Sequence, residues 1–153
     1  VTVTPSILSD GSHTVTINCA DNDGNRATEK STTFTVDTVP PILNVTSPDD
    51  GLITNKSTVV VAGTTNDATS SPVTLTVNGK TVSVGSDGSF STTVTLSEGE
   101  NTITIEAVDK AGKVSTVTRT VTYDSSTPVI ESITITPNPV NTSKSMVIRV
   151  VVK

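Results

Sequence analysis

Apolar residues alternate with threonine or another polar residue along most of this chain. This period-two pattern is typical of β-strands that bury one face. In the middle of the chain it predicts seven short strands, bounded by Gly, Pro, Asn or Asp turn signals. The predicted strands are residues 42–45, 58–63, 72–77, 81–84, 90–96, 101–109 and 115–123. Asn78-Gly79, between the third and fourth strands, predicts a two-residue hairpin, because both residues tolerate a positive φ.

The same alternation predicts which side chains are buried, because every second residue of a strand points to the same face of its sheet. In the middle segment we expect the core to contain Leu75, Val77, Val82, Val84, Phe90, Val94, Leu96, Ile103, Ile105, Ala107, Val117 and Val121. In the opening segment the matching positions are Val15, Ile17 and Cys19, facing Phe34 and Val36.

An internal repeat is the most informative feature of the chain. Residues 8–24 read LSDGSHTVTINCADNDG, and residues 96–112 read LSEGENTITIEAVDKAG, a shift of 88 residues. Further on, the segment that ends at Asp37 matches the segment that ends at Asp124, with a shift of 87 residues. A repeat of this length indicates tandem copies of one structural unit.

The phase of the repeat divides the chain into three parts. Residues 1–37 match the C-terminal part of a unit, residues 38–125 form a complete unit, and residues 126–153 resemble the N-terminal strands of a third. The unit is close to the size of an immunoglobulin-type sandwich, about 100 residues. We therefore predict an all-β fold of tandem immunoglobulin-like β-sandwiches, with seven strands in the complete unit. Such a chain is either a piece of a longer array or completes its end units with a partner chain.

Composition and charge narrow the function classes. One third of the residues are hydrophobic, only 2% are aromatic, and Trp is absent, which is enough for modest cores. The net charge of −5 is spread along the chain, so the basic patch expected of a nucleic-acid-binding protein is missing. No run approaches the ~18 apolar residues that suggest a membrane span.

Several motifs carry a resemblance to a known family. They are PPILNVTSPDDG at residues 40–51, VNGKTV at 77–82, DGSF at 87–90, LSEGENTITIEAVDKAG at 96–112 and VTYD at 121–124. This set resembles bacterial immunoglobulin-like repeats of the glucodextranase-B-like type. The resemblance covers residues 38–124 well, residues 5–37 as half a unit and residues 128–153 weakly. In the third unit TPNPV at 136–140 replaces SPDDG at 47–51, which suggests a different subfamily.

The resemblance implies a setting and a role. Such modules occur in tandem in secreted enzymes, cell-surface and S-layer-like proteins, adhesin stalks and phage tails. It therefore implies an extracellular, cell-surface or virion location and a non-catalytic spacer or stalk, with neighbouring immunoglobulin-like domains of the same or another chain as partners. Two alternatives stay open. One is an adhesion or carbohydrate-binding accessory module that contacts cell-wall glycan or a host surface. The other is a subunit of a self-assembling filament or phage tail.

The chain holds little material for catalysis. It has one His and one Cys, so neither a Ser-His-Asp nor a Cys-His arrangement is indicated, and we expect no enzyme activity. By the repeat, His13 takes the place of Asn101 and is expected in an exposed turn. Cys19 takes the place of Ala107 and is expected to be a small buried thiol.

Aromatic residues bear on the carbohydrate alternative, because sugar sites commonly use exposed aromatic rings. The chain has Phe34, Phe90 and Tyr123. The two phenylalanines lie on predicted strands and are expected in cores, and Tyr123 lies at a strand end near a junction.

Carboxylates gather around the first predicted junction. Asp37 ends one unit, Asp21 and Asp23 lie in a hairpin loop of that unit, and Asp49 and Asp50 lie in a loop of the next. Hard oxygen ligands from several loops suit Ca²⁺. The sequence therefore offers these five residues as ligands of a junction Ca²⁺. The alternative is that they only form turns, where Asp is common for backbone reasons.

Two observations limit this calcium hypothesis. The loop that begins at Asp21 is not an EF-hand, because Thr32 stands where the twelfth-position Glu is required. The second junction is the weaker candidate, because Lys110 and Ala111 replace part of the acidic set. No other cofactor is indicated.

Overall fold

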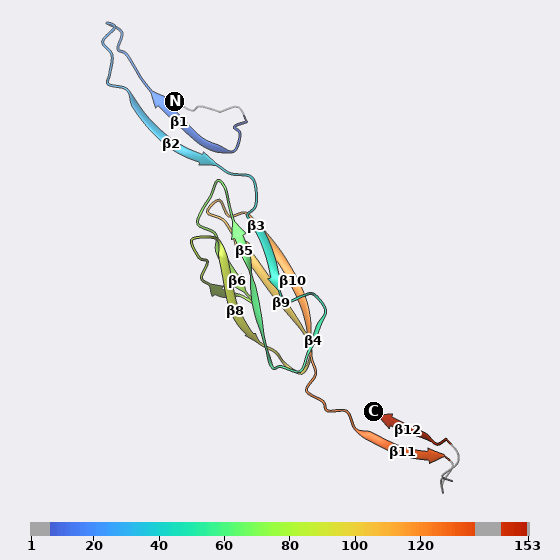
Figure 1. The fold of residues 1–153 in the computed structure, drawn as a ribbon. Helices are drawn as coiled ribbons and strands as arrows, with labels where there is room; N and C mark the ends of the chain where they lie inside the picture. Colours follow the sequence, from blue (N-terminus) through green and yellow to red (C-terminus); the bar gives the residue numbers. More distant parts are fainter. Residues whose placement is uncertain (1–6, 137–144, 153) are drawn as a thin grey trace.

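The computed structural model describes residues 7–136 and 145–152. Every regular element in these ranges is a β-strand, which confirms the predicted all-β class. The middle of the chain forms two sheets, and a two-stranded hairpin lies on either side of it (Figure 1). Residues 137–140, which set the third unit apart in the sequence, lie outside the described ranges.

The middle segment is a sandwich of a three-stranded and a five-stranded sheet. The first sheet has the order β3-β5-β8, with β3 at Ile42–Ser47, β5 at Thr58–Asn66 and β8 at Ser89–Thr95. The second has the order β4-β10-β9-β6-β7, with β4 at Leu52–Thr54, β10 at Val114–Tyr123, β9 at Gly99–Val108, β6 at Thr74–Val77 and β7 at Lys80–Val82.

The core between the two sheets confirms the predicted buried faces of the strands from residue 74 onward. Most of the predicted core residues are buried, and Val84, Val94 and Val117 pack against the core partly buried. The alternation works because β-branched and other aliphatic side chains of both sheets meet in one layer. The fully formed core consists of Val45, Val61, Leu75, Val77, Val82, Phe90, Leu96, Ile103, Ile105, Ala107 and Val121.

The sandwich has eight strands rather than the predicted seven. The additional strand, β4, is only three residues long and pairs parallel with the end of β10. The turn before it is held by the Asp50 carboxylate, which accepts a hydrogen bond from the Thr120 backbone N–H at 2.7 Å. Gly51 N donates to Thr120 O at 2.8 Å. The chain thus crosses from one sheet to the other after β3. Three residues are too short for alternation to reveal a strand.

The predicted Asn-Gly hairpin is confirmed. Asn78 has φ 49° and Gly79 has φ 75°, the positive values that a type I′ turn requires. Asn78 also continues the sheet beyond the end of β6. Its N–H donates to Thr104 O, and its side-chain Oδ1 accepts from Thr104 N, both at 2.8 Å. The turn between β6 and β7 is therefore fastened to β9.

Each end hairpin is a single layer. Strand β1 at Gly11–Ile17 pairs with β2 at Lys30–Val36, and β11 at Ile130–Thr136 pairs with β12 at Val147–Val152. Cys19, expected to be buried, is exposed in the described structure. Apolar residues predicted for a core here are exposed as well, because a core needs a second layer to face the first. These are Val15, Ile17 and Phe34.

His13 is also placed differently from the expectation. It lies inside β1, half-buried, rather than in an exposed turn. Its ring stacks on Phe34 with 5.6 Å between centroids, and its Nε2 lies 2.7 Å from Ser9 O. Asn101, its counterpart in the repeat, donates from Nδ2 to Ser97 O at 2.7 Å. The two residues therefore hold equivalent loops.

Gly63 lies where β5 packs closely against β3 and Phe90, and it generates a stability prediction. A Cβ at this position would lie 2.1 Å from Asn44 O and 2.9 Å from Phe90 Cζ. We expect Gly63→Ala to lower the free energy of unfolding by about 2–3 kcal/mol, because the backbone of β3 must move to admit the methyl group. Urea unfolding followed through Tyr123, the one tyrosine in a chain without Trp, measures this change.

The neighbouring exposed Thr64 offers the matched control for Gly63→Ala. Thr64→Ala should change the free energy of unfolding by no more than about 0.5 kcal/mol. Equal stability of the two variants would contradict the packing described for Gly63.

Candidate metal centre

Three carboxylates meet at the end of the sandwich that lies next to the β1–β2 hairpin. Asp37 follows β2, Asp67 follows β5, and Asp109 follows β9. Each offers an oxygen, and these oxygens all lie within 4.8 Å of one another. Asp67 and Asp109 are buried, with 7% and 6% of their surface exposed, and Asp37 is half-buried. Such a group of hard oxygen donors is suited to a divalent cation.

The position of the two buried carboxylates follows from the strand pattern. Residues 61, 63, 65 and 67 are all buried, and so are residues 103, 105, 107 and 109. Each series continues the inward-facing row of a strand by one more step of two residues. The first row belongs to β5 and the second to β9, in opposite sheets. Asp67 and Asp109 therefore close the core at the same end of the sandwich.

Asp37 and Asp67 are connected through Ser70. Asp67 Oδ1 accepts hydrogen bonds from Thr69 N at 2.8 Å and from Ser70 N at 2.6 Å. The Ser70 hydroxyl donates to Asp37 Oδ2. Asp37 Oδ1 accepts from Val39 N at 3.1 Å. These bonds orient both carboxylates and attach the end of the hairpin to the β5–β6 loop.

Of the two carboxylate oxygens of Asp109, one accepts a hydrogen bond and the other has no hydrogen-bond partner in the described structure. Its Oδ1 accepts a hydrogen bond from Lys113 N at 2.9 Å. Its Oδ2 is buried and has no hydrogen-bond partner, and it is the one such side-chain atom within the described ranges. A buried polar atom without a partner is unfavourable, because it has lost water and gained nothing in return.

A cavity of about 370 Å³ opens beside this cluster. It is lined by Thr35, Asp37, Thr69, Ser70, Ser71, Lys110 and Ala111. Its walls come from the hairpin and from two loops of the sandwich, which Lys110 N joins by donating to Ser70 O at 3.3 Å. Of the three carboxylates, Asp37 lines this cavity.

Of the five carboxylates that the sequence offered, the structure brings only Asp37 to this cluster. Asp21 and Asp23 lie in the β1–β2 loop, at the far end of the hairpin from the sandwich (Figure 1). Asp21 accepts hydrogen bonds there from Asp23 N at 3.0 Å, Asn25 N at 2.8 Å and Asn25 Nδ2 at 2.8 Å. The seven residues of β2 span roughly 23 Å between this loop and Asp37.

Asp49 and Asp50 also lie far from the cluster. They lie in the β3–β4 turn at the opposite end of the sandwich, where Asp50 is bonded to Thr120 and Asp49 O accepts from Leu52 N at 3.4 Å. The expectation that all five residues share one site is therefore wrong. The reason is topological: the two ends of a strand, and the loops attached to them, are separated by the length of the strand.

The sequence held a signal for Asp109 that the calcium hypothesis did not use. Asp109 is the repeat counterpart of Asp21. The two loops are alike, since Asn25 N donates to Asp21 Oδ1 at 2.8 Å and Lys113 N donates to Asp109 Oδ1 at 2.9 Å. The structure brings the loop of Asp109, and not the loop of Asp21, to Asp37 at the end of the hairpin. Asp67 has no such signal in the sequence.

The repeat also recurs in the contacts just after the last strand of each unit. Thr38 N donates to Asp10 Oδ1 at 3.0 Å, and Ser125 N donates to Glu98 Oε1 at 3.0 Å. The hydroxyl groups of both residues donate to the same carboxylates. Each unit therefore fastens the first residues of the linker that follows it in the same way.

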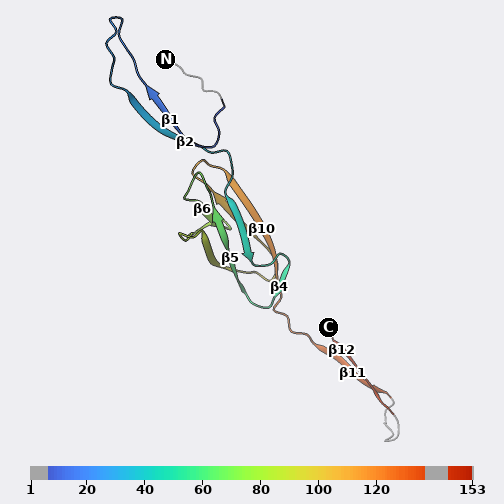
Figure 2. The same ribbon diagram turned by 45° about the horizontal axis from the view of Figure 1, so that its top comes forward.

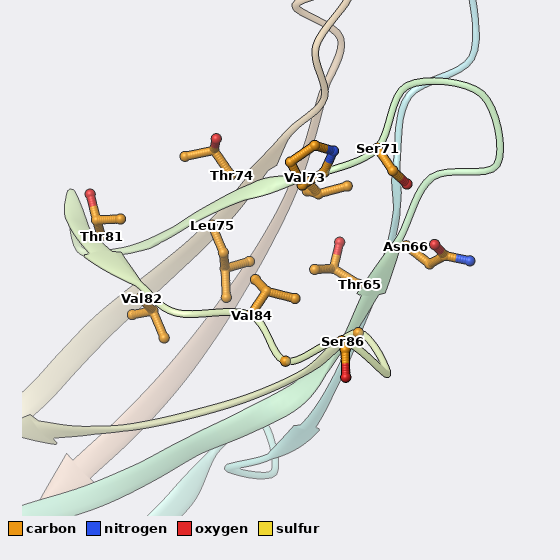
Figure 3. A pocket seen from close by; sticks show the side chains of 13 residues that line it. Thr65, Asn66, Ser71, Val73, Thr74, Leu75, Thr81, Val82, Val84 and Ser86 are labelled. Atoms are coloured by element: carbon orange, nitrogen blue, oxygen red, sulfur yellow. The ribbon is translucent and has the colours of Figure 1, made fainter.

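A second hollow lies at the open edge of the sandwich, between β6–β7 and the β5–β8 side, and has a volume of about 610 Å³ (Figure 3). Pro72, Val73, Leu75, Val82 and Val84 supply its apolar side chains. None of its lining residues is aromatic or charged. The hollow therefore lacks the ring surface and the charged groups with which sugar sites commonly orient a ligand.

The repeated unit can now be compared with known proteins. The family model described as glucodextranase, domain B, matches residues 41–125, which is more than half of the chain. The chain belongs to this family. A bacterial Ig-like domain model matches residues 1–38 of this glucodextranase-B-type chain.

Individual relatives are larger than the matched segment. Bacillopeptidase F of Bacillus subtilis (strain 168) is 33% identical over 127 residues, which are 83% of this chain but only 9% of that protein. Among solved structures, the fibronectin(III)-like modules of Clostridium thermocellum CbhA match with a TM-score of 0.43 and 20% identity over 76% of this chain and 64% of theirs. A tetra-tandem repeat in the extending region of a large adhesion protein matches with a TM-score of 0.46 and 22% identity, over 94% and 46%.

One further property concerns membranes. In residues 7–136 and 145–152, no helix is long and apolar enough to cross a bilayer.

The loop at Asp21 generates a pH prediction. Hydrogen bonds from the side chain and backbone of Asn25 lower the pKa of Asp21. A carboxyl whose pKa is lower in the folded chain stabilises its loop above the unfolded value of about 3.9, and this contribution disappears as the pH falls through the lowered pKa. We expect Asn25→Ala to raise the pKa of Asp21 toward its ordinary value, as measured by NMR titration of the carboxyl carbons.

Asp87 provides the internal control for this titration. The Ser89 hydroxyl holds the pKa of Asp87 below its ordinary value, and Asn25→Ala leaves that contact untouched. A pKa of Asp21 that stays the same in the variant would show that Asn25 does not hold the loop.

Proposed function

We propose that this chain is a non-catalytic spacer or stalk segment of an extracellular bacterial surface, S-layer-like or appendage protein. The observation that carries the proposal is the repeated junction contact, in which Asp10 holds Thr38 and Glu98 holds Ser125 in the same way. A contact that recurs after each unit is suited to building a regular linear array. We propose the division into residues 1–37, 38–125 and 126–153 as the units of that array.

The arrangement of the strands supports a role in spanning distance. The hairpin β1–β2, the sandwich and the hairpin β11–β12 follow one another along one line in two views (Figure 1, Figure 2). The chain enters the sandwich at β3 and leaves it after β10, at opposite ends. A pull on the chain ends therefore acts along the length of the strands.

Hydrogen bonds near the points where the chain enters and leaves the sandwich would resist a force that pulls on the chain ends. The Ser115 hydroxyl donates to Pro41 O at 2.5 Å, so the first residues of the sandwich are tied to β10. At the other end, β4 pairs parallel with the last residues of β10, and Asp124 N donates to Thr54 O at 2.9 Å. Pulling β4 and β10 apart along their axes loads several hydrogen bonds at once.

The same role fits more than one setting. A spacer serves a surface protein by holding a distal part away from the cell, and it serves a secreted enzyme by separating domains. Bacillopeptidase F, of which the matched segment is only 9%, is a peptidase by name. We propose an accessory, non-catalytic place for this chain in either setting. The carbohydrate-binding alternative receives less support, because no aromatic residue lines the edge hollow.

A filament or phage-tail subunit is the second candidate, and the exposed apolar faces of the end hairpins favour it. Ile17, Phe34, Ile133 and Ile148 are each at least 41% exposed. Strands of another chain would cover these faces if the chain polymerised. Sedimentation at increasing concentration distinguishes the two: open-ended polymers support a filament, and a small discrete species supports the spacer.

The spacer proposal makes a mechanical prediction. When the chain is stretched between its ends in a single-molecule experiment, we expect the sandwich to unfold in one step. The step should lengthen the chain by roughly 25 nm, which is the extended length of its residues at 3.3–3.6 Å each less the folded length. Specific glycan binding by the folded chain, together with gradual extension without a discrete step, would contradict the proposal.

A further inference from the structure

Three carboxylates that come from two units and three loops lie together where the hairpin joins the sandwich. We propose that Asp37, Asp67 and Asp109 bind one hard divalent cation, for which Ca²⁺ is the fitting probe, and that this ion fastens the β1–β2 hairpin to the sandwich. The inference goes beyond the spacer role and does not depend on it, because an ion can bind whatever the array carries.

The geometry of the cluster fits a shared ion. Ca²⁺ is bound by oxygen ligands at 2.3–2.6 Å, so two ligands on opposite sides of one ion lie about 4.8 Å apart. The ligand oxygens of the three carboxylates fall within that separation. Irregular loops supply them, which suits the variable coordination of Ca²⁺ better than the strict octahedron of Mg²⁺.

The buried oxygen of Asp109 points to a ligand independently of the cluster. Asp109 is 6% exposed, its Oδ1 is occupied by Lys113 N, and its Oδ2 has no partner in the described structure. Carboxylates this close to one another also repel, and burial strengthens the repulsion because little water screens it. A bound cation both completes the coordination of Asp109 and removes the repulsion.

The surrounding hydrogen bonds hold the donors in place without an ion. Asp67 Oδ1 is fixed by two backbone N–H groups, and Asp37 is fixed by Val39 N and the Ser70 hydroxyl. Donors held in advance lose little freedom when the ion binds. The cavity bordered by Ser70 and Lys110 leaves space beside Asp37 for water ligands.

Lys110 is the competing positive charge. It is exposed and lines the same cavity as Asp37. If Lys110 were the natural partner of the carboxylates, its removal would destabilise the protein and no ion would be needed. If the carboxylates bind an ion, Lys110→Met should tighten binding, because the lysine repels the cation.

The repeat extends the inference along the array. Asp21 is the counterpart of Asp109, and Asp124 is the counterpart of Asp37. Ser126 N donates to Asp124 Oδ1 at 2.9 Å, as Val39 N does to Asp37 Oδ1. Each unit thus carries one carboxylate at the start of its next linker and one in the loop that faces the preceding unit. The repeat therefore supplies counterparts for two of the three proposed ligands.

The first experiment measures binding and stability of the full chain. We expect isothermal titration calorimetry of the chelator-treated protein to show Ca²⁺ binding. The melting temperature should rise by about 10 °C when free Ca²⁺ reaches one hundred times the dissociation constant. Asp109→Asn and Asp67→Asn should each weaken binding at least tenfold. Asp49→Asn is the matched control and should bind as the native chain does, because Asp49 lies at the other end of the sandwich.

The melting temperature in EDTA separates a ligand from a structural residue. Asn keeps the oxygen that accepts from Lys113 N or from Ser70 N, so Asp109→Asn and Asp67→Asn retain the native hydrogen bonds at that oxygen. Because they also remove repulsion, we expect both variants to melt at or above the native temperature in EDTA and below it in Ca²⁺. A lower melting temperature in both conditions would indicate a purely structural role and overturn the inference.

A second experiment tests whether the ion joins the hairpin to the sandwich. Cys19 is exposed in the hairpin loop, and Thr93→Cys on β8 adds a second exposed labelling position. With fluorescent dyes at both cysteines, we expect Ca²⁺ to narrow the distribution of distances, and Asp109→Asn to abolish the narrowing. The same distribution in EDTA and in Ca²⁺ would overturn the proposed fastening.

Two outcomes overturn the binding site as a whole. In the first, neither 10 mM Ca²⁺ nor 10 mM Mg²⁺ produces a heat of binding in calorimetry or changes the melting temperature. The other is binding that is equally strong in the native chain and in Asp109→Asn. Neither result would affect the 25 nm unfolding step expected of the sandwich, so failure of the ion site and failure of the spacer proposal are distinguishable.

Discussion

The structure depends on the burial of every second residue of β5 and β9 between two sheets. Val61 on one strand and Ile103 and Ile105 on the other have no exposed surface, so neither strand can shift by one residue without turning its apolar face outward. The register is therefore rigid up to the ends of both strands. Asp67 and Asp109 stand on the next inward-facing positions, and the same constraint that forms the core brings the two carboxylates together.

The second organising feature is that equivalent residues of the two repeats make the same contacts. A carboxylate just before the last two strands of a unit holds the second residue after those strands, as Asp10 holds Thr38 and Glu98 holds Ser125. A carboxylate in the last hairpin loop has its Oδ1 held by a backbone N–H four residues later, as in Asp21 and Asp109. Similar sequences thus produce similar contacts after the hairpin β1–β2 and after the sandwich.

Local patterns predicted the fold well and the long-range contacts poorly. The alternation identified the buried face of β9, and the turn at Asn78-Gly79 was recognised from two residues, because both signals act within a few positions. Strand β4 was missed because its three residues pair with β10, about seventy positions away. Cys19 was expected in a core, but a lone hairpin has no opposite layer to cover it.

The candidate site shows the same division. The sequence by itself determined that the units are all-β, that they repeat about every 87 residues, and that the first of them ends at Asp37. These properties can be predicted because strand periodicity and turn chemistry depend on neighbouring residues. Only the tertiary structure decided which loops meet at the junction. Asp67 and Asp109 lie on opposite sheets, and their proximity arises when the sheets pack face to face and bring the ends of β5 and β9 to the same side as the preceding unit.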